Sequence, residues 1–448
     1  MDIKVSVVIP SLNVNDYILR CLDSIRNQTL KEIEIICIDA GSTDGTREKI
    51  IECKEKDNRI KLIDSAVKSY GYQVNVGIKN AKGEYISIVE SDDYVTKNML
   101  LHLYEQAKKY KVDVSKGDKI FIYDDKKKEH KHIFSGKEEI NYDKKINNGE
   151  LMNLHISDNN LWNGIYRREF LIKEQLLLNE SKGAAFQDIG FLQQVHMLAD
   201  SMVFSNVPVY YYQMYRDGSS SKSPNRVRYV FQEIKYLEDF VAIKYPYKWS
   251  IHRAAVHANL ARCFAEELRI FLINNSCGFE DIDWYNDYLQ IKEMINMWIE
   301  NDDIDRKILS ENEIEEIYYS VIDYNEFSKY IKRTFSRDKK ILREIINTVN
   351  DKACIIFGCG QWGRDVIKKL DYYNRKIVAI TDNNKKMWHS KIDGVEVLPP
   401  NEVIKKWPNG VFVIANKKHT REMKNQLLIM GIAKENILEY NVKWIDGY

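Results

Sequence analysis

The segment Tyr85–Val95 reads YISIVESDDYV. Its apolar, β-branched start predicts a buried strand, and three carboxylates, Glu90, Asp92 and Asp93, follow at the carboxyl end. One acid could cap the helix predicted for residues 97–110, KNMLLHLYEQAKKY. Three exceed that need, because clustered like charges repel unless a cation or nearby donors offset them. The pattern therefore favours a divalent cation, Mg²⁺ or Mn²⁺, on hard oxygen ligands.

Strands and helices alternate around this segment. VSVVIP at 5–10, IEIICI at 33–38 and RIKLID at 59–64 predict strands, and residues 18–25 carry apolar side chains at helical spacing. A glycine-punctuated stretch at 70–84 leads into the fourth strand. This alternation is typical of an α/β fold with a mostly parallel sheet, which binds ligands at the carboxyl ends of its strands. The acidic cluster is therefore expected at the ligand-binding edge.

The composition excludes several classes of function. The 67 Lys and Arg residues balance 66 Asp and Glu residues, for a formal net charge of +1, so no basic footprint for nucleic acid is present. The nine histidines show no HExxH motif and no Cys/His spacing typical of zinc. Neither a serine-hydrolase elbow nor a P-loop occurs in the sequence.

The same composition predicts a cytoplasmic protein. Its seven cysteines contain no CxxC pair, which fits free thiols in a reducing compartment. The N-terminal apolar run lacks a basic segment before it and reads as a strand, not a signal peptide. No run approaches about 18 apolar residues, so we expect no spanning helix. Attachment to the inner face of a membrane is compatible with these features.

The length of 448 residues predicts two or three domains. We expect an α/β domain at 1–225, a helical linker or accessory region at 226–345, and a Rossmann-like domain at 346–448. The helical region shows no chemical constellation and suggests packing or spacing, with acceptor binding or oligomerisation as the alternative.

The third segment contains a strand, a G-x-G-x-x-G turn and a helix. The turn glycines are Gly358, Gly360 and Gly363, and the next strand ends at Asp382. This spacing matches the dinucleotide-binding fingerprint, in which glycines admit a pyrophosphate and the acid meets a ribose hydroxyl. A ligand-free structural role, a nucleotide or nucleotide-sugar, and NAD(P) all remain open.

The N-terminal motifs, taken in order, resemble the GT-A glycosyltransferases of family 2. These motifs are IPSLN at 9–13, IDAGSTDGT at 38–46 and the stretch from 71 to the acidic cluster, within a resemblance that covers about residues 4–220. It implies a fold that binds a nucleotide-diphosphate sugar, with a DxD-type motif that holds a metal ion on the diphosphate. Here the motif reads Glu90-Ser91-Asp92. Glu90 replaces the usual Asp and reaches further, so Asp92 is the principal expected ligand.

The resemblance also implies a donor pocket. Asp39 would accept a hydrogen bond from the base, most often uracil, and the other expected donor-binding residues are Pro10, Asn13, Asp44, Tyr72, Gln73, Asn75 and Ser91. Asn and Asp are common in turns, so turn chemistry is the alternative for Asn13, Asp39 and Asp44. Loop packing is the alternative for Tyr72, Gln73 and Asn75.

The segment GAAFQDIGFLQQVHMLA, at 183–199, resembles the family's acidic dipeptide at the start of a helix. Asp188 is the expected catalytic base, while Gln187 replaces the usual Glu. Asp188 could instead cap the helix. By the same resemblance Trp162 and Asn163 border the acceptor, although core packing is the alternative for Trp162. YRDGSSS at 215–221, with Arg216, resembles a segment that closes over the diphosphate.

These features predict a metal-dependent inverting glycosyltransferase. It would transfer a sugar from a UDP-sugar to a hydroxyl of a glycan or lipid-linked glycan in bacterial surface polysaccharide biosynthesis, such as capsule or lipopolysaccharide. One alternative is a non-catalytic scaffold that binds sugar nucleotides or senses a cofactor. A second is an NAD(P)-dependent oxidoreductase that uses the C-terminal glycines. Its Y-x-x-x-K pair, Tyr372 and Lys376, lies too close to those glycines to serve a nicotinamide.

Overall fold

The computed structural model describes residues 2–123, 128–134, 136–214, 226–274, 284–350, 352–416 and 418–443. Two compact units make up the chain: Met1–Leu268 with Cys277–Val321, and Arg269–Ser276 with Ile322–Tyr448. The expected helical region is thus shared between the units. The boundaries proposed after residues 225 and 345 remain predictions.

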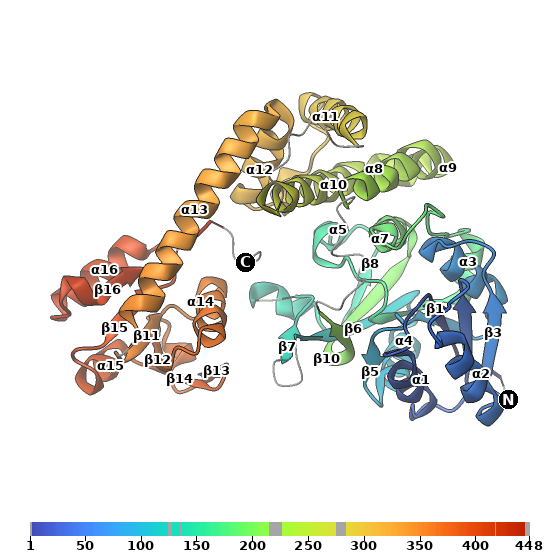
Figure 1. Ribbon diagram of the computed structural model, residues 1–448, viewed down its shortest axis with the longest axis horizontal. Helices are drawn as coiled ribbons and strands as arrows, with labels where there is room; N and C mark the ends of the chain where they lie inside the picture. Colours follow the sequence, from blue (N-terminus) through green and yellow to red (C-terminus); the bar gives the residue numbers. More distant parts are fainter. Residues whose placement is uncertain are drawn as a thin grey trace. The chain divides into compact units, whose positions relative to one another are not determined.

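The first unit is built on one ten-stranded sheet (Figure 1), in the order β3-β2-β1-β4-β9-β6-β10-β5, with β7 paired to β6 and β8 to β10. Its strands are β1 (Val5–Ser11), β2 (Ile33–Asp39), β3 (Ile60–Asp64), β4 (Tyr85–Ile88), β5 (Tyr94–Val95), β6 (Val114–Ile122), β7 (Lys128–Lys131), β8 (Lys145–Asn147), β9 (Gly164–Arg167) and β10 (Ser201–Gln213). Strands β1 to β4 are mutually parallel, and β9 pairs antiparallel with β4 and β6. The α/β class is confirmed. The expectation of a mostly parallel sheet is wrong, because the strands added after β4 pair mainly antiparallel: β6 pairs in parallel with β10, but β5 and β8 pair antiparallel with β10, and β7 with β6. Every residue of β1 and β2 is buried, as in a sheet covered on both faces.

Seven α-helices accompany this sheet. They are α1 (Ile18–Arg26), α2 (Thr46–Lys56), α3 (Tyr70–Asn80), α4 (Met99–Tyr110), α5 (Leu154–Ser157), α6 (Arg168–Lys173) and α7 (Gln187–Leu198), with a 3₁₀ turn, η1, at Gly136–Asn141. The glycine-punctuated stretch is the helix α3, whose N-cap Ser69 accepts from the Tyr72 N–H. Its glycines permit close packing, because a Cβ at Gly77 would lie 2.2 Å from a Val8 methyl carbon.

The first unit also contains a helical layer. It comprises α8 (Arg226–Tyr236), the π-turn η3 (Leu237–Val241), α9 (Ala242–Lys244), most of α10 (Pro246–Asn274), α11 (Tyr285–Glu300), the 3₁₀ turn η5 (Arg306–Ile308) and α12 (Glu311–Ile322). Arg226 on α8 makes a bidentate ion pair with Glu267 on α10, at 2.6 Å for both bonds. This pair fixes the start of α8.

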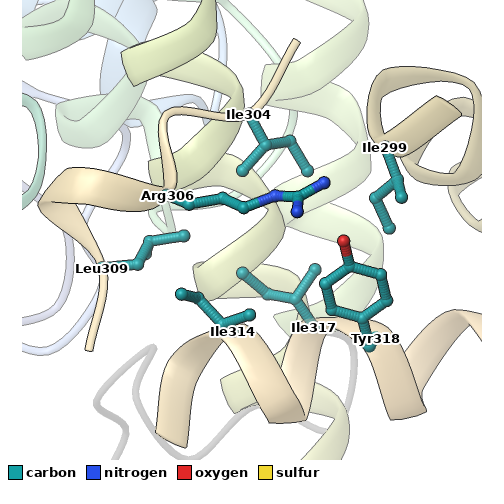
Figure 2. A pocket seen from close by; sticks show the side chains of 7 residues that line it. All are labelled: Ile299, Ile304, Arg306, Leu309, Ile314, Ile317 and Tyr318. Atoms are coloured by element: carbon teal, nitrogen blue, oxygen red, sulfur yellow. The ribbon is translucent and has the colours of Figure 1, made fainter. Parts of the chain in front are cut away.

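A small hollow lies between α11, η5 and α12 (Figure 2). Its lining consists of Ile299, Ile304, Arg306, Leu309, Ile314, Ile317 and Tyr318. The Arg306 guanidinium lies 5.6 Å from the centroid of the Tyr318 ring. The lining is apolar apart from these two side chains and includes no carboxylate, so we interpret it as a packing feature of the helical layer.

The second unit contains a six-stranded sheet in the order β13-β14-β12-β11-β15-β16. Its elements are α13 (Tyr324–Thr348), β11 (Cys354–Phe357), α14 (Gln361–Tyr372), β12 (Ile377–Thr381), η6 (Lys385–Met387), β13 (Lys391–Ile392), β14 (Val395–Leu398), α15 (Pro400–Lys406), β15 (Val411–Ile414), α16 (Thr420–Ile429), η7 (Lys434–Asn436) and β16 (Ile437–Glu439). All pairings are parallel except that of β13 with β14. An apolar cluster covers each face, as in a doubly wound fold. Within the described ranges, no helix is long and apolar enough to cross a bilayer.

Candidate active site

The candidate site lies where three neighbouring parallel strands end. Ser11 at the end of β1 stands opposite Asp39 at the end of β2, and β4 on the other side of β1 ends just before the acidic cluster. Because parallel strands present their carboxyl ends at one edge, the loops after β1, β2 and β4 meet there. The sequence placed the acidic motif at this edge correctly.

The three acids differ in their surroundings. Glu90 and Asp92 are partly exposed, whereas Asp93 is 1% exposed. Tyr70 donates its hydroxyl hydrogen to Glu90 Oε1 at 2.5 Å, and the Arg20 guanidinium donates to the Asp92 backbone oxygen at 3.0 Å. A cation from solvent can therefore reach the carboxylates of Glu90 and Asp92 but not that of Asp93. Two carboxylates provide the hard oxygen ligands that Mg²⁺ or Mn²⁺ requires.

Asp93 instead ties the acidic motif to β10. Its carboxyl accepts from the Gln213 N–H at 2.7 Å and from the Tyr210 hydroxyl at 3.0 Å. The Tyr210 oxygen also accepts from the Glu90 N–H at 3.0 Å. Burial first, and then the charge of Asp92, raises the pKa of Asp93 well above its usual value. The surplus acid thus has a structural explanation that the sequence did not supply.

The loops after β1 and β2 hold each other through polar side chains. Asn13, at φ 51°, donates its N–H to Ser42 Oγ and accepts from the Thr43 N–H, both at 2.9 Å. Asp44 accepts from the Asn15 N–H at 2.9 Å and the Thr46 N–H at 3.0 Å. These bonds are turn chemistry, and they also give this edge a defined shape.

Asp39 is 1% exposed and is bound within its own turn. Its carboxylate accepts from the Ser42 N–H and hydroxyl, at 3.1 and 2.5 Å, and lies 3.5 Å from Arg47 Nη1. Of its neighbours in the expected pocket, Pro10 is buried within β1 opposite Ile38, and Ser91 is 5% exposed. The expected contact between Asp39 and a base remains a prediction.

Three expected pocket residues lie on α3. Tyr72 is partly exposed, and the buried Gln73 amide lies 3.5 Å from the Ser11 backbone oxygen, at the strand edge. Asn75 exchanges hydrogen bonds with the Leu178 backbone at 2.9 Å and donates to Glu180 at 3.0 Å. The geometry places Gln73 at the edge and engages Asn75 in packing the loop before α7.

Asp188 stands in the first turn of α7 and is partly exposed. The N-cap of α7 is Phe186, at φ 66°, so Asp188 is not the capping residue. Burial raises the pKa of Asp188 to about 6, although the Ile189 N–H and the charges of Arg226 and Lys116 oppose the rise. This value suits a general base near neutral pH. Gln187, buried beside it, donates to Ser181 instead.

The acidic motif and Asp188 share neighbouring tyrosines. Burial, followed by the charges of Glu90 and Asp188, raises the pKa of Tyr70 well above its usual range. Burial, followed by Asp93, Asp92 and Asp188 among others, raises the pKa of Tyr212 in the same direction. The fold thus brings residues about a hundred positions apart in sequence into one electrostatic neighbourhood.

The sequence did not reveal two buried ionisable residues near Asp188. Glu233 on α8 accepts from the Asn179 amide at 2.9 Å, and its second oxygen fills the space that Gly190 leaves on α7. Burial raises the pKa of Glu233 well above its usual value, and the charge of Asp188 adds to this rise. Lys116 on β6 is fully buried and bonds both oxygens of Asp158, at 2.6 and 2.7 Å. The glycine at position 190, inside a helical pattern, could have indicated that another side chain, here Glu233, packs closely against α7.

The expected acceptor residues are both buried. Trp162 is 3% exposed and stacks on Tyr212, with ring centroids 5.1 Å apart. Asn163 is fully buried and donates to the Gly117 backbone oxygen at 2.7 Å. Both contacts are packing contacts, and the acceptor role remains a prediction. Arg216 and the segment 215–221 lie outside the described residues.

In the second unit, the expected glycine turn follows β11. Gly358 has φ +125°, and a Cβ at Gly363 would lie 1.9 Å from the Gly358 oxygen, so the fold requires both glycines. A Cβ at Gly360 would meet nothing within 4 Å. Asp382 accepts from the Cys359 N–H at 2.7 Å, which closes the turn. Of the three turn glycines, Gly360 is thus the one whose lack of a side chain is not explained by packing or by backbone conformation.

Comparison with known proteins gives two family matches. The pattern of glycosyl transferase family 2 matches residues 6–174. The pattern described as C2185-like, N-terminal, matches residues 350–438. The first match contains the strand edge and the acidic motif, and the second contains the C-terminal glycine turn.

Related proteins agree with the first match. Glycosyltransferase GlyG of Streptococcus pneumoniae is 34% identical over 227 residues, which cover 49% of this chain and 73% of GlyG. A poly(ribitol-phosphate) beta-glucosyltransferase of Bacillus spizizenii is 42% identical over 118 residues, or 25% of this chain and 19% of that protein. The crystal structure of S. aureus TarS 1-349 in complex with UDP-GlcNAc superposes with a TM-score of 0.55 at 18% identity, covering 75% of this chain and 92% of TarS. The last comparison shows that the fold is the GT-A fold. On the identity to GlyG, together with the match of the family pattern, the chain belongs to glycosyltransferase family 2.

Proposed function

We propose that this glycosyltransferase is a metal-dependent, inverting enzyme that uses a UDP-sugar. The observation that carries the proposal is the convergence of Glu90, Asp92 and Asp188 around Tyr70 and Tyr212 at the carboxyl edge of the sheet. A pair of reachable carboxylates beside a carboxylate of raised pKa provides both a cation site and a base. TarS, which shares the fold, binds UDP and UDP-GlcNAc, and this supports the choice of a uridine donor.

Glu90 and Asp92 would hold Mg²⁺ or Mn²⁺ against the donor diphosphate. The ion would stabilise the negative charge that develops on the leaving nucleoside diphosphate. Tyr70 orients Glu90 through its hydroxyl, and Asp93 anchors the backbone of the motif to β10. The Glu90 carboxylate and the backbone of the motif are thus held by contacts that exist before any ligand arrives.

Asp188 would remove the proton from the acceptor hydroxyl as that oxygen attacks the anomeric carbon. The new bond forms on the face opposite the leaving diphosphate, which inverts the configuration. With a pKa of about 6, Asp188 is mostly ionised at neutral pH and still basic enough to assist the transfer. In the family pattern a Glu precedes the base, and here Gln187 takes its place. The buried Glu233 instead provides a carboxyl group near Asp188.

For the acceptor we propose a hydroxyl of a glycan or lipid-linked glycan in bacterial surface polysaccharide biosynthesis. The poly(ribitol-phosphate) beta-glucosyltransferase, which is similar to this chain over 118 residues, acts on a polymer and supports a polymeric acceptor. The enzyme would then work in the cytoplasm at the inner face of the membrane. The second unit is proposed to be a Rossmann-like domain, whose ligand at Gly358, Gly360 and Gly363 remains to be identified.

The test is release of nucleoside diphosphate from a panel of sugar nucleotides with Mn²⁺, Mg²⁺ or EDTA. We expect slow hydrolysis of one UDP-sugar that EDTA abolishes and that Asp92→Asn reduces by about 10²-fold or more. Asp23→Asn is the control, because Asp23 is an exposed acid on α1 paired with Arg26. Turnover that is equal in both variants, or that persists in EDTA, would overturn the metal role. If the wild type binds a donor but never turns it over, even with acceptors, the scaffold alternative is favoured.

A further inference from the structure

The hairpin of β6 and β7 can be located in Figure 1, and it carries three side chains of the kinds that bind metal ions. Asp118 is on β6, His130 on β7, and His132 follows the end of β7. Asp118 Oδ2 lies 3.1 Å from His130 Nε2 and 2.6 Å from His132 Nδ1. One ligand atom from each residue lies within 4.8 Å of the other two.

Strand pairing accounts for this grouping. His130 pairs with Ile120 and Lys131 with Lys119, so continuing the register brings His132 opposite Asp118. Residues two apart on a strand share a face, and His130 is the diagonal neighbour of Asp118. The two imidazole rings have centroids 4.0 Å apart, and their side chains are 36% and 43% exposed. Solvent ions can therefore reach the two histidines.

The carboxylate of Asp118 is held in place from its other side. Its side chain is fully buried, and Oδ1 accepts from the Ile133 N–H at 3.0 Å and from the Tyr142 hydroxyl at 2.7 Å. These two bonds leave Oδ2 directed at the histidines. Oriented ligands with a hydrogen-bonded support are what metal sites in proteins require.

We propose that Asp118, His130 and His132 bind a transition-metal ion of the zinc class. Ligands about 2.0 to 2.1 Å from a tetrahedral ion lie about 3.3 Å from one another, so only small side-chain movements separate the observed distances from coordination. Two imidazoles and one carboxylate favour Zn²⁺, Co²⁺ or Ni²⁺ over Mg²⁺, and water would complete the coordination. The ion would cross-link β6, β7 and the segment after them, which is a structural role.

This site is separate from the proposed donor site. Neighbouring residues on a strand point to opposite faces, and Lys119 lies with its Nζ 5.4 Å from the centroid of the Trp162 ring. Asp118 therefore faces away from the aromatic cluster of Trp162 and Tyr212. The two sites also differ in chemistry, because the donor site offers only carboxylate oxygens and the hairpin site offers two nitrogens.

The experiment is calorimetric titration of the tag-free, EDTA-stripped full chain with Zn²⁺, together with the visible spectrum of the Co²⁺-loaded protein. We expect micromolar or tighter binding that is at least about tenfold weaker in His130→Ala and in His132→Ala. His419→Ala is the matched control, because His419 is an exposed histidine 2.6 Å from Glu422 elsewhere in the fold. The same site should remain in Asp92→Asn, which lacks the donor-site ligand.

Two results would overturn the proposal. One is a wild type that shows neither saturable binding of Zn²⁺ in the titration nor the visible absorption of tetrahedral Co²⁺. The other is binding that is equal in the wild type and in both folded histidine variants. If a variant fails to fold, the cobalt spectrum of the wild type still tests the proposal, since a spectrum without tetrahedral absorption would contradict it.

Discussion

Asp92 and Asp93 are adjacent and chemically identical, yet the fold gives them different environments. Asp92 is partly exposed at the strand edge, whereas Asp93 is buried against Tyr210 and Gln213. The sequence could predict that three acids need compensation, because that follows from Coulomb's law. It could not predict which acid would be internal, because that depends on β10, which is more than a hundred residues away.

Stability should reveal the difference. Because the pKa of Asp93 is raised in the folded state, the folded protein holds a proton that the unfolded chain releases near pH 4, and stability falls as the pH rises towards the folded pKa. Asn resembles the protonated acid and can still accept from the Gln213 N–H. We therefore expect urea unfolding to show Asp93→Asn gaining stability relative to the wild type between pH 5 and pH 8. If Asp93→Asn instead lowered the free energy of unfolding by the same amount at pH 5 and at pH 8, this expectation would be contradicted.

The pH dependence of turnover should follow Asp188. A base must be ionised, so kcat/KM is expected to rise with pH through a limb near pH 6 and then level off. Asp188→Asn should lower kcat by about 10²-fold or more and remove this limb. Asp200→Asn, which alters an exposed acid just after α7, serves as the control. A wild-type limb near pH 4, or an unchanged limb in Asp188→Asn, would assign the base elsewhere.

At the scale of elements, the packing of α8 on α7 could not be predicted from the sequence. The resemblance of residues 183–199 predicted a helix at α7, and the spacing of apolar residues predicted strands β1 to β4, because each pattern is local. The contact between Glu233 and Gly190 depends on how two helices meet, and no local pattern encodes that. The helix α3 is a second example of packing that the sequence did not show. Its glycines allow close contact with Val8 and with the loop before α7.

Gly190→Ala should destabilise the first unit. A Cβ at this position would lie 2.0 Å from Glu233 Oε2, so the buried carboxyl must move, and overpacking of this kind costs about 1–3 kcal/mol. In the Glu233→Ala background the same substitution should cost less, because the obstructing group is absent. Gly360→Ala, where the new Cβ has open space, is the control. Urea unfolding measures all four variants, and equal costs in both backgrounds would show that the contact is not the cause.

For the molecule as a whole, local motifs predicted the α/β class, both sheets and the strand edge, since each rests on short-range spacing. The division of the helical layer was not predictable, because α8 and α10 join the first unit through long-range contacts such as Glu233 with Asn179 and His252 with His155. The hairpin metal ligands were also missed. His130 and His132 match no metal-binding motif until strand pairing brings Asp118 between them.

The two sheets should carry separable functions. Every expected donor-site residue lies in the first unit, and the glycine turn lies in the second. We therefore expect Gly360→Asp in the full chain to leave hydrolysis of the sugar nucleotide within about twofold of the wild type, whereas Asp92→Asn lowers it by about 10²-fold or more. Binding of any nucleotide to the second unit should be weakened by Gly360→Asp and unchanged by Asp92→Asn. The added carboxylate would repel a phosphate at a turn that otherwise has open space.

Calorimetric titration of the same two variants with UDP, UDP-sugars and NAD(P)H completes this comparison. Gly363→Ala is the wrong probe for it, because a Cβ 1.9 Å from the Gly358 oxygen disturbs the turn itself and would confuse unfolding with lost binding. If Gly360→Asp abolished turnover while Asp92→Asn preserved it, the reaction would belong to the second unit and the oxidoreductase alternative would gain support. Loss of turnover in both variants would instead indicate that the second unit controls the transferase site.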